Sequence, residues 1–398
     1  MKIGIDASNL RAGGGITHLR EFLNAARPER HGIDRVLVWG GIRTLDCLPR
    51  QRWLRAVHEK MLDGSLPMRL FWQRYRLPEL ARGGCDLLFS PGGNRPVRGC
   101  PSVVMCRNML PFEPAELGRY SGSFQYVRLK LLRMAQSRSF QNADGVIFLS
   151  RYARSTVMGQ IGDIRGSSIV VPHGVDPRFR KPPRDQASIG AYSRTKPFRL
   201  LYVSTIDLYK HQENVAKGVI RLHRNGTPVI LDLVGGAYEP ARRSLRSLLQ
   251  ALDPSGEVVR EHGPTSFSSL ESFYHGADAF VFASSCENLP NILIEAMASG
   301  LPIACSGRGP MPEVLGDGGV YFDPEDQDAT VDTLGRLLSD PDLRSRCARA
   351  AYHRAQRYSW DECARSTFCF FEKVLAGPGS VHATEAPANS RQTQSRFS

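Results

Sequence analysis

Two glutamates eight residues apart are the side chains best placed to do chemistry in this sequence. Glu287 follows a short apolar segment, and Glu295 lies in the run Asn-Ile-Leu-Ile-Glu-Ala-Met-Ala after Pro290. That run is apolar nearly all round, which is typical of a helix buried on most faces. An unpaired buried carboxylate is costly, so Glu295 needs a partner. The partner is either a structural hydrogen bond or ion pair, or a ligand.

A ligand accounts for both glutamates. In open α/β sheets ligands lie beyond the carboxyl ends of the strands, and the loop after Ser285 is such a place. The free N–H groups at the helix start, residues 291–293, favour a phosphate. One turn further on, Glu295 can accept two vicinal hydroxyls, as in a ribose, and Glu287 lies where a sugar would project. The pattern predicts a site for a nucleotide diphosphate sugar.

Alternating strand-like and helix-like segments surround these residues. Apolar strands are expected at 2–6, 36–39, 87–89, 103–106 and 146–149, and again at 199–203, 229–234, 279–283, 303–305 and 320–322. Short apolar runs separated by helices are typical of parallel α/β structure. The polar, proline-rich stretch 181–197 divides the two series and is expected to be an interdomain linker.

The composition excludes several classes of protein. The chain has 398 residues, of which 41% are hydrophobic and 23% charged, as in an ordinary globular protein. The longest apolar run has five residues (279–283), so no membrane-spanning segment is expected. Nine scattered cysteines without an export signal predict reduced thiols and a cytoplasmic location. No P-loop, dinucleotide, zinc-protease or serine-hydrolase motif occurs.

The positive charge is concentrated in the first half. Residues 1–180 hold 28 Lys and Arg against 14 Asp and Glu, whereas residues 181–398 hold 24 against 25. The first half is therefore expected to meet an anionic partner. Within it, a helix is expected over 118–142, with an apolar stripe of Phe124, Val127, Leu131 and Met134. Such a helix either packs its stripe into a core or lies in a membrane interface.

The two glutamates also carry a resemblance to a known family. Glu287 and Glu295 form a Glu-x7-Glu spacing, and residues 296–302 read Ala-Met-Ala-Ser-Gly-Leu-Pro. This segment resembles the signature of the retaining glycosyltransferases of family 4, or glycosyl transferases group 1. The glycine loop 13–15, the segment 171–176 and the loop 208–211 are similar to further segments of that family. The likeness spans about residues 2–375.

The resemblance implies the α/β fold named GT-B, in which two Rossmann-like parallel-sheet domains face each other across a cleft. Residues 1–180 would form the acceptor-side domain, 181–197 the linker and 198–356 the domain that binds the nucleotide sugar. A helix at 357–375 would cross back to the first domain. The tail 377–398 lacks an apolar pattern and is expected to be disordered.

The resemblance also implies roles for individual residues. Lys210 would neutralise the donor diphosphate. Glu287 would contact the transferred sugar and stabilise an oxocarbenium-like transition state, while Glu295 would hold the ribose. Gly15 would let the backbone approach a phosphate or the acceptor closely, or would simply form a tight turn. Further donor contacts are expected from the loop and the helix start, at Asn288, Leu289, Asn291 and Ile292.

The chain departs from the family pattern at two places. The Arg that usually stands five residues before Lys210 is replaced by Thr205, and Arg308 is a candidate substitute. The His that usually lies near the reacting sugar is absent, because the corresponding strand is followed by Arg107 and Asn108. We expect Arg107 or Asn108 to contact donor or acceptor instead.

Two further expectations complete the predicted site. His173 lies in the segment that enters the linker, where it either reaches the cleft and acts there or has a structural role. No metal is expected, because no Asp-x-Asp sequence stands at a strand end. No cofactor is expected besides the donor substrate.

Together with these features, the resemblance implies a retaining glycosyltransferase and its biological setting. It would move a hexose, such as mannose, from a GDP- or UDP-linked donor to a glycan or lipid-linked acceptor in the synthesis of a bacterial surface polysaccharide or lipopolysaccharide. The basic half would contact an anionic membrane at its cytoplasmic face, and no nucleic acid is expected. The alternatives are an epimerase or phosphorylase of the same fold, an inactive transferase, and a basic protein that binds nucleic acid or an anionic surface without catalysis.

Overall fold

The computed structural model describes residues 1–11 and 13–377, and its strands form two parallel sheets. The first has the order β3-β2-β1-β4-β5-β6-β7. The second has the order β10-β9-β8-β11-β12-β13. Their strands are β1 (Lys2–Asp6), β2 (Arg35–Gly40), β3 (Leu54–His58), β4 (Leu87–Ser90), β5 (Ser102–Met105), β6 (Gly145–Phe148), β7 (Ser167–Val170), β8 (Phe198–Val203), β9 (Val229–Val234), β10 (Val259–Gly263), β11 (Ala279–Phe282), β12 (Ile303–Ser306) and β13 (Val320–Phe322).

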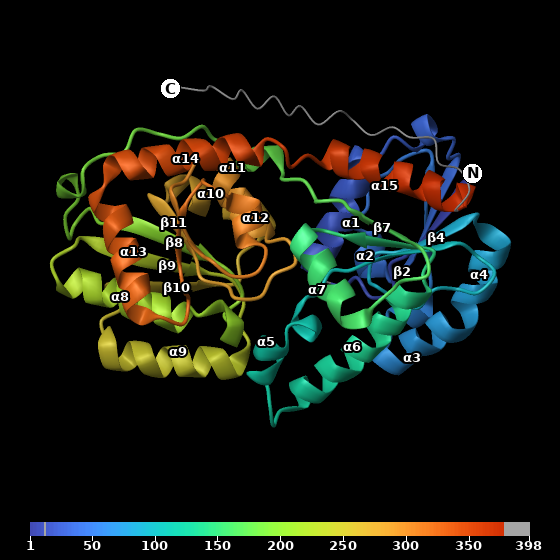
Figure 1. The fold of residues 1–398 in the computed structure, drawn as a ribbon, viewed down its shortest axis with the longest axis horizontal. Coiled ribbons are helices and arrows are strands. Elements are labelled where there is room, and N and C mark those ends of the chain that lie inside the picture. Colours follow the sequence, from blue (N-terminus) through green and yellow to red (C-terminus); the bar gives the residue numbers. More distant parts are fainter. Residues whose placement is uncertain (12, 378–398) are drawn as a thin grey trace, which may run out of the picture.

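Helices connect the strands, and the two sheets with their helices form two lobes along the long axis of the molecule (Figure 1). The N-terminal lobe contains α1 (Gly14–Ala25), α2 (Ile42–Leu45), α3 (Leu66–Phe71), α4 (Leu77–Gly84), α5 (Pro114–Gly118), α6 (Phe124–Asn142) and α7 (Arg151–Ile161). The C-terminal lobe contains α8 (Gln212–Arg224), α9 (Glu239–Leu252), α10 (Phe267–Gly276), α11 (Asn291–Ala298), α12 (Met311–Leu315), α13 (Gln327–Ser339) and α14 (Pro341–Ala355).

The burial of each strand explains whether its sequence is apolar enough for the strand to be predicted. The central strands β4, β5, β6 and β11 are buried along their whole length, as expected for parallel strands covered on both faces. Three strands that no apolar run indicates, β3, β7 and β10, are edge strands, whereas the fourth edge strand, β13, was expected at 320–322. The side chains of β3, β7 and β10 are mostly half-buried or exposed, so their sequences are polar.

The last described helix, α15 (Trp360–Ala376), returns to the N-terminal lobe and packs along α1 (Figure 1). The ring centroids of Phe368 and Phe22 lie 5.3 Å apart, and those of Phe371 and Phe89 lie 5.2 Å apart. The backbone of Trp360 comes so close to Gly174 that a Cβ there would lie 2.2 Å from the Trp360 nitrogen. The crossing therefore requires a residue without a side chain at position 174.

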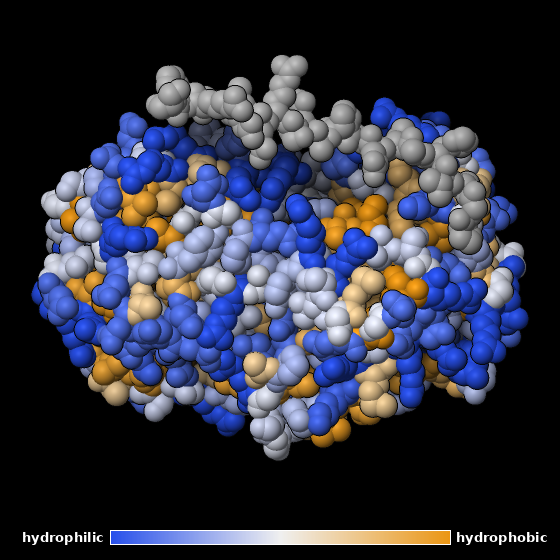
Figure 2. Space-filling view, in the orientation of Figure 1, coloured by the Kyte–Doolittle hydropathy of each residue, from blue (hydrophilic) through white to orange (hydrophobic). Residues whose placement is uncertain are grey.

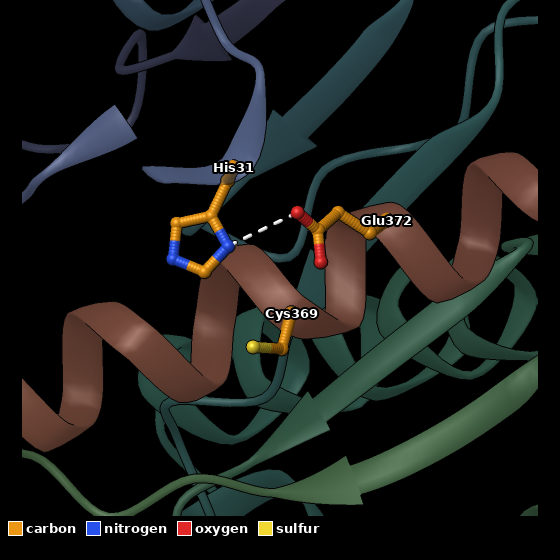
Figure 3. Close-up of side chains that lie close together, drawn as sticks. All are labelled: His31, Cys369 and Glu372. Carbon is orange, nitrogen blue, oxygen red and sulfur yellow. Dashed lines mark hydrogen bonds and ion pairs between the residues drawn. The ribbon is translucent and has the colours of Figure 1, made fainter. Parts of the chain in front are cut away.

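A polar contact between His31 and Glu372 holds the C-terminal end of α15 against the N-terminal lobe (Figure 3). His31, at the end of the 3-10 helix η1 (Pro28–His31), lies with its Nδ1 3.1 Å from Glu372 Oε1. The exposed thiol of Cys369 lies nearby, and the three potential ligand atoms of this group lie within 4.8 Å of one another. The contact joins α15 to η1 and so to the first lobe.

The helix expected over 118–142 differs from the expectation in two ways. It is divided into α5 and α6, because the chain turns at residues 119–123 and Ser123 accepts a hydrogen bond from the Tyr126 backbone as the N-cap of α6. Its apolar stripe is exposed, since Leu129, Gln136, Ser139 and Phe140 form the buried face instead. The expectation that the stripe packs into a core is therefore wrong.

Two other predicted segments can be placed. The linker at 181–197 packs against the C-terminal lobe, where the Lys181 backbone donates to the carbonyl of Ala298, the last residue of α11. The tail was predicted at 377–398, and residues 378–398 of it lie outside the described residues. None of the helices in the described part of the chain is both long enough and apolar enough to cross a bilayer.

Removing the ring of Phe368 should destabilise the protein by about 3–5 kcal/mol, because this side chain is 1% exposed and packs between two other rings. Chemical denaturation of Phe368→Ala measures the loss. The control is Lys373→Ala on the exposed face of the same helix, which should change the stability by no more than about 0.5 kcal/mol. Equal effects of the two substitutions would show that α15 is not part of the packed core.

Candidate functional site

Lys210 and Glu287 form an ion pair at the carboxyl ends of the strands of the second sheet. Lys210 ends the 3-10 helix η7 (Leu208–Lys210) after β8, and Glu287 lies in the loop after β11. The Lys210 ammonium donates to Glu287 Oε1, and the two side chains are only 8% and 16% exposed. The rings of Tyr209 and Phe282 lie 4.9 and 5.4 Å from the ammonium. The two residues are close enough for one ligand to reach both.

Glu295 lies one turn into α11 and is buried. Its Oε2 accepts a hydrogen bond of 2.9 Å from the Tyr274 hydroxyl. Burial raises the pKa of Glu295 to about 7, although the Tyr274 hydrogen bond lowers it. The partner that the sequence requires is thus Tyr274, a residue of α10 that no sequence pattern marked. A single hydrogen bond leaves the carboxylate able to accept more.

The start of α11 presents backbone N–H groups that have no hydrogen-bond acceptor in the described residues. Its N-cap is Pro290, and no side chain caps it. Within the described part of the chain, no group accepts from the backbone N–H of Asn288, Leu289, Asn291 or Ile292. Four free N–H groups beside a helix N-terminus form an anion-binding arrangement. These are the same backbone positions that the sequence predicts for donor contacts.

The loop before α11 is held by the N-terminal lobe. The Asn288 side chain donates to the Cys106 carbonyl at 2.9 Å, and the backbone carbonyl of Asn288 accepts from the Ser150 hydroxyl at 2.7 Å. Nearby, the carboxylate of Glu313 in α12 accepts from the backbone N–H groups of Arg151 and Tyr152 at the start of α7, both at 2.9 Å. The domains therefore meet at the loop that carries Glu287.

His173 is buried in this boundary. Its Nε2 lies 3.3 Å from the Leu289 carbonyl and its Nδ1 3.4 Å from the Gly174 carbonyl. The ring stacks on Trp360 with 5.8 Å between centroids. Burial lowers the pKa of His173 to about 4, so the ring is neutral at pH 7. Because a neutral ring carries one N–H, it donates to only one of these two carbonyls. A buried ring stacked on Trp360 favours the structural alternative for His173.

The glycine loop and Arg107 approach the same place from the N-terminal lobe. Gly13, with φ of +66°, leads into α1, which no side chain caps. The Arg107 guanidinium donates to the carbonyls of Gly14 at 2.7 Å and Gly15 at 3.2 Å. A Cβ on Gly14 would lie 3.9 Å from both the Arg107 guanidinium and the Asn291 amide. The starts of α1 and α11 thus converge beside Arg107.

Arg107 differs from the other cations near the boundary. Burial lowers its pKa to about 10, and it pairs with no carboxylate in the described residues. Arg308, by contrast, is paired with both Asp323 and Glu325, at 2.8 Å each. Arg308 is therefore already neutralised and is a poor substitute for the Arg replaced by Thr205.

Asn108 and Thr205 have local roles. The Asn108 side chain accepts from the Leu110 backbone at 3.1 Å and so holds the turn that enters the 3-10 helix η4 (Leu110–Phe112). The Thr205 carbonyl accepts from the Gln212 side chain at 3.0 Å. His18 of α1 was not singled out from the sequence. Its ring is buried, and its centroid lies 5.4 Å from that of the Trp360 ring. Only its place in the helix after the glycine loop could have indicated it.

With this geometry in place, comparison with known proteins identifies the domain that carries Glu287 and Glu295. Residues 186–354 match the family model of glycosyl transferases group 1. This segment, which carries both glutamates, is therefore similar to the glycosyl transferases group 1 family. The resemblance inferred from the Glu-x7-Glu spacing is thus confirmed, and the family is one of transferase enzymes.

Among curated relatives, a D-inositol 3-phosphate glycosyltransferase of Arthrobacter is 28% identical over 207 residues, which is 50% of this chain and 48% of the relative. A GDP-mannose-dependent phosphatidylinositol monomannoside mannosyltransferase of Mycolicibacterium smegmatis is 29% identical over 246 residues, or 58% of this chain and 63% of the relative. The chain thus spans about half the length of the curated relatives that it matches.

Solved structures extend the likeness of fold to both domains. The sucrose-phosphate synthase of Thermosynechococcus elongatus superposes with a TM-score of 0.75 at 19% identity, covering 94% of this chain and 99% of the other. Anabaena HepE in complex with UDP-glucose gives a TM-score of 0.70 at 18% identity, covering 94% and 100%. The predicted GT-B fold is confirmed.

Glu295→Gln should stabilise the protein at pH 8. Because burial raises the pKa of Glu295 from 4.5 to about 7, ionising it in the folded state costs about 3 kcal/mol at pH 8. The stability of the wild type relative to the variant therefore falls as the pH rises from about 5 to 7. Denaturation of both proteins at pH 5 and pH 8 measures this. An equal difference at the two pH values would contradict the assignment of a raised pKa.

Proposed function

We propose that this protein is a retaining glycosyltransferase that moves a hexose from a nucleotide diphosphate sugar to a glycan or lipid-linked acceptor. One observation carries the proposal: Lys210, Glu287, Glu295 and the uncapped start of α11 lie together in the family domain. The relatives' names support a nucleotide-sugar donor, since one depends on GDP-mannose and one structure contains UDP-glucose.

In the proposed complex the donor replaces internal partners of the site residues. The diphosphate takes the Lys210 ammonium and the free N–H groups at the start of α11. Glu287, freed from Lys210, then faces the sugar, where its charge stabilises an oxocarbenium-like transition state. The ionised form of Glu295 accepts the two ribose hydroxyls. Each group exchanges one polar partner for another, so none is left buried and unpaired.

The proposed transfer proceeds on one face of the sugar. The bond between the anomeric carbon and the phosphate oxygen breaks, and the acceptor oxygen bonds to the same carbon from the same side. The acceptor proton passes to the leaving phosphate. No protein base is needed for this step, which agrees with the burial of His173 at the domain boundary.

Arg107 is proposed as the second cation of the diphosphate site. Its guanidinium has five N–H donors, and two of them hold the glycine loop. It pairs with no carboxylate in the part of the chain that the structure describes, so an anion at the convergence of α1 and α11 would neutralise it. Arg107 is half-buried, so its charge is only partly solvated and an anion there would be favourable.

The acceptor is proposed to bind on the side of the basic N-terminal domain. Residues 1–180 carry a net charge of +14, from 28 basic and 14 acidic residues. A phosphorylated or lipid-linked glycan at the anionic cytoplasmic face of a membrane fits that charge. Synthesis of a bacterial surface polysaccharide or lipopolysaccharide is the setting we propose.

Lys210→Ala should weaken donor binding by about 10- to 100-fold, because it removes a charge-assisted contact to the diphosphate. Calorimetric titration with GDP- and UDP-linked hexoses measures the loss. Lys196→Ala, in the exposed linker, is the matched control and should bind like the wild type. No binding of any nucleotide sugar to the wild type would contradict the proposed function.

Arg107→Ala should weaken binding of the same donor by about tenfold if the guanidinium contacts the diphosphate. Arg98→Ala, an exposed position of the same domain, is the control. Unchanged donor affinity in Arg107→Ala would show that Arg107 only holds the glycine loop. Incubating the donor without acceptor separates the alternative functions, since an epimerase would interconvert the sugar and a transferase would not.

A further inference from the structure

The large apolar side chains that the described structure exposes are confined to the N-terminal domain. Nine of these eleven residues lie on α6 or on α3 with the π-helical turn η3 (Trp72–Arg76) that follows it. They are Leu66, Met68, Leu70, Phe71, Tyr75, Phe124, Val127, Leu131 and Met134. Both segments lie at the lower right of the molecule in Figure 1, and Figure 2 shows apolar side chains along this lower edge.

The apolar face of α6 is continuous along the helix. Phe124, Val127, Leu131 and Met134 recur at helical spacing and are 83%, 53%, 61% and 52% exposed. The helix attaches to the domain by its opposite face, so the exposed residues, here named the α6 face, are not needed for the core. A contiguous exposed apolar face on one element indicates an interaction surface.

Cations flank the α6 face. Arg128 and Lys130 stand on either side of it, and Arg138 continues its line, all three exposed. The helix holds four basic residues and no acidic one, and none of the four pairs with a carboxylate in the described residues. The Lys130 ammonium instead lies 4.5 Å from the centre of the Tyr126 ring. The charge of this helix is therefore uncompensated within the protein.

We propose that the α6 face docks on the surface of an anionic lipid bilayer. An apolar stripe between cations matches an interface in which acyl chains lie beneath anionic headgroups. Pairing with a second copy is disfavoured, because a twofold contact would place this acid-free helix against itself. The exposed apolar residues of α3 and η3, accompanied by Arg74 over the Tyr75 ring, add a second apolar contact from the same domain.

The docked surface is connected to the site. The turn between α5 and α6 contacts the second domain, where the Tyr120 hydroxyl donates to Asp207 at 2.6 Å and Arg119 pairs with Glu325. Asp207 caps the helix that ends at Lys210. A membrane against α6 would therefore lie beside the donor loops. This step rests on the proposed function, because it supplies a route for a lipid-linked acceptor.

Co-sedimentation of the full chain with vesicles tests the proposal. The wild type should pellet with vesicles of equal parts phosphatidylcholine and phosphatidylglycerol and stay in solution with phosphatidylcholine alone. Leu131→Gln with Met134→Gln should weaken this binding about tenfold or more, since both side chains would otherwise enter the interface. Both positions are exposed, so the melting temperature should stay unchanged.

Charge reversal is the second arm. Arg128→Glu with Lys130→Glu should abolish binding to the anionic vesicles, whereas Arg243→Glu with Arg346→Glu on the C-terminal domain, also exposed, should not. Equal binding of wild type and α6 variants, or no binding of the wild type, would overturn the proposal. So would a dimer that the Leu131→Gln and Met134→Gln substitutions dissociate. Calorimetric titration with the nucleotide sugar does not depend on vesicles. A protein that does not bind vesicles but binds the nucleotide sugar would overturn this proposal and leave the proposed function intact.

Discussion

The site depends on the ion pair between Lys210 and Glu287, which lies beside a helix start whose backbone N–H groups have no acceptor in the described residues. Lys210 and Glu287 neutralise each other while both are largely shielded from water, and the first N–H groups of α11 stand unpaired beside them. Separating such a pair is costly unless each member finds a new partner of opposite charge or polarity. A diphosphate sugar supplies both partners at once. Glu295, one turn into α11, is likewise a shielded group that needs a polar partner. Its carboxylate accepts one hydrogen bond, from the Tyr274 hydroxyl, and can accept further hydrogen bonds from a ligand.

Much of the fold was predictable because its central strands are buried on both faces and so read as apolar runs. The alternation of strands and helices follows from such local patterns, whereas the returning C-terminal helix was expected only from the resemblance to the glycosyl transferases group 1 family. The edge strands β3, β7 and β10 were not predictable in this way, since one side of each lacks a neighbouring strand and their sequences are polar. The apolar stripe of α6 shows a second limit of sequence-based prediction. Residue spacing indicates that a helix has an apolar face, but it does not indicate whether that face is buried or exposed.

The residues of the candidate site were predictable, but their present partners were not. Glu287, Glu295 and Lys210 follow from motif and spacing, whereas the pairing of Lys210 with Glu287 and the bond from Tyr274 depend on tertiary packing. The contacts of Asn288 with the Cys106 carbonyl and of Arg107 with the glycine loop join segments far apart in the sequence. No local pattern contains that information. These contacts bury His173 at the domain boundary and hold Arg107 at the glycine loop, where it has no carboxylate partner among the described residues.

The most direct test of this account is a crystal structure of the protein with an intact nucleotide sugar. The account predicts that the Lys210–Glu287 pair is broken, with the Lys210 ammonium on the diphosphate, Glu287 facing the sugar and Glu295 on the ribose hydroxyls. A nucleotide bound elsewhere, or bound with the Lys210–Glu287 pair intact, would contradict it.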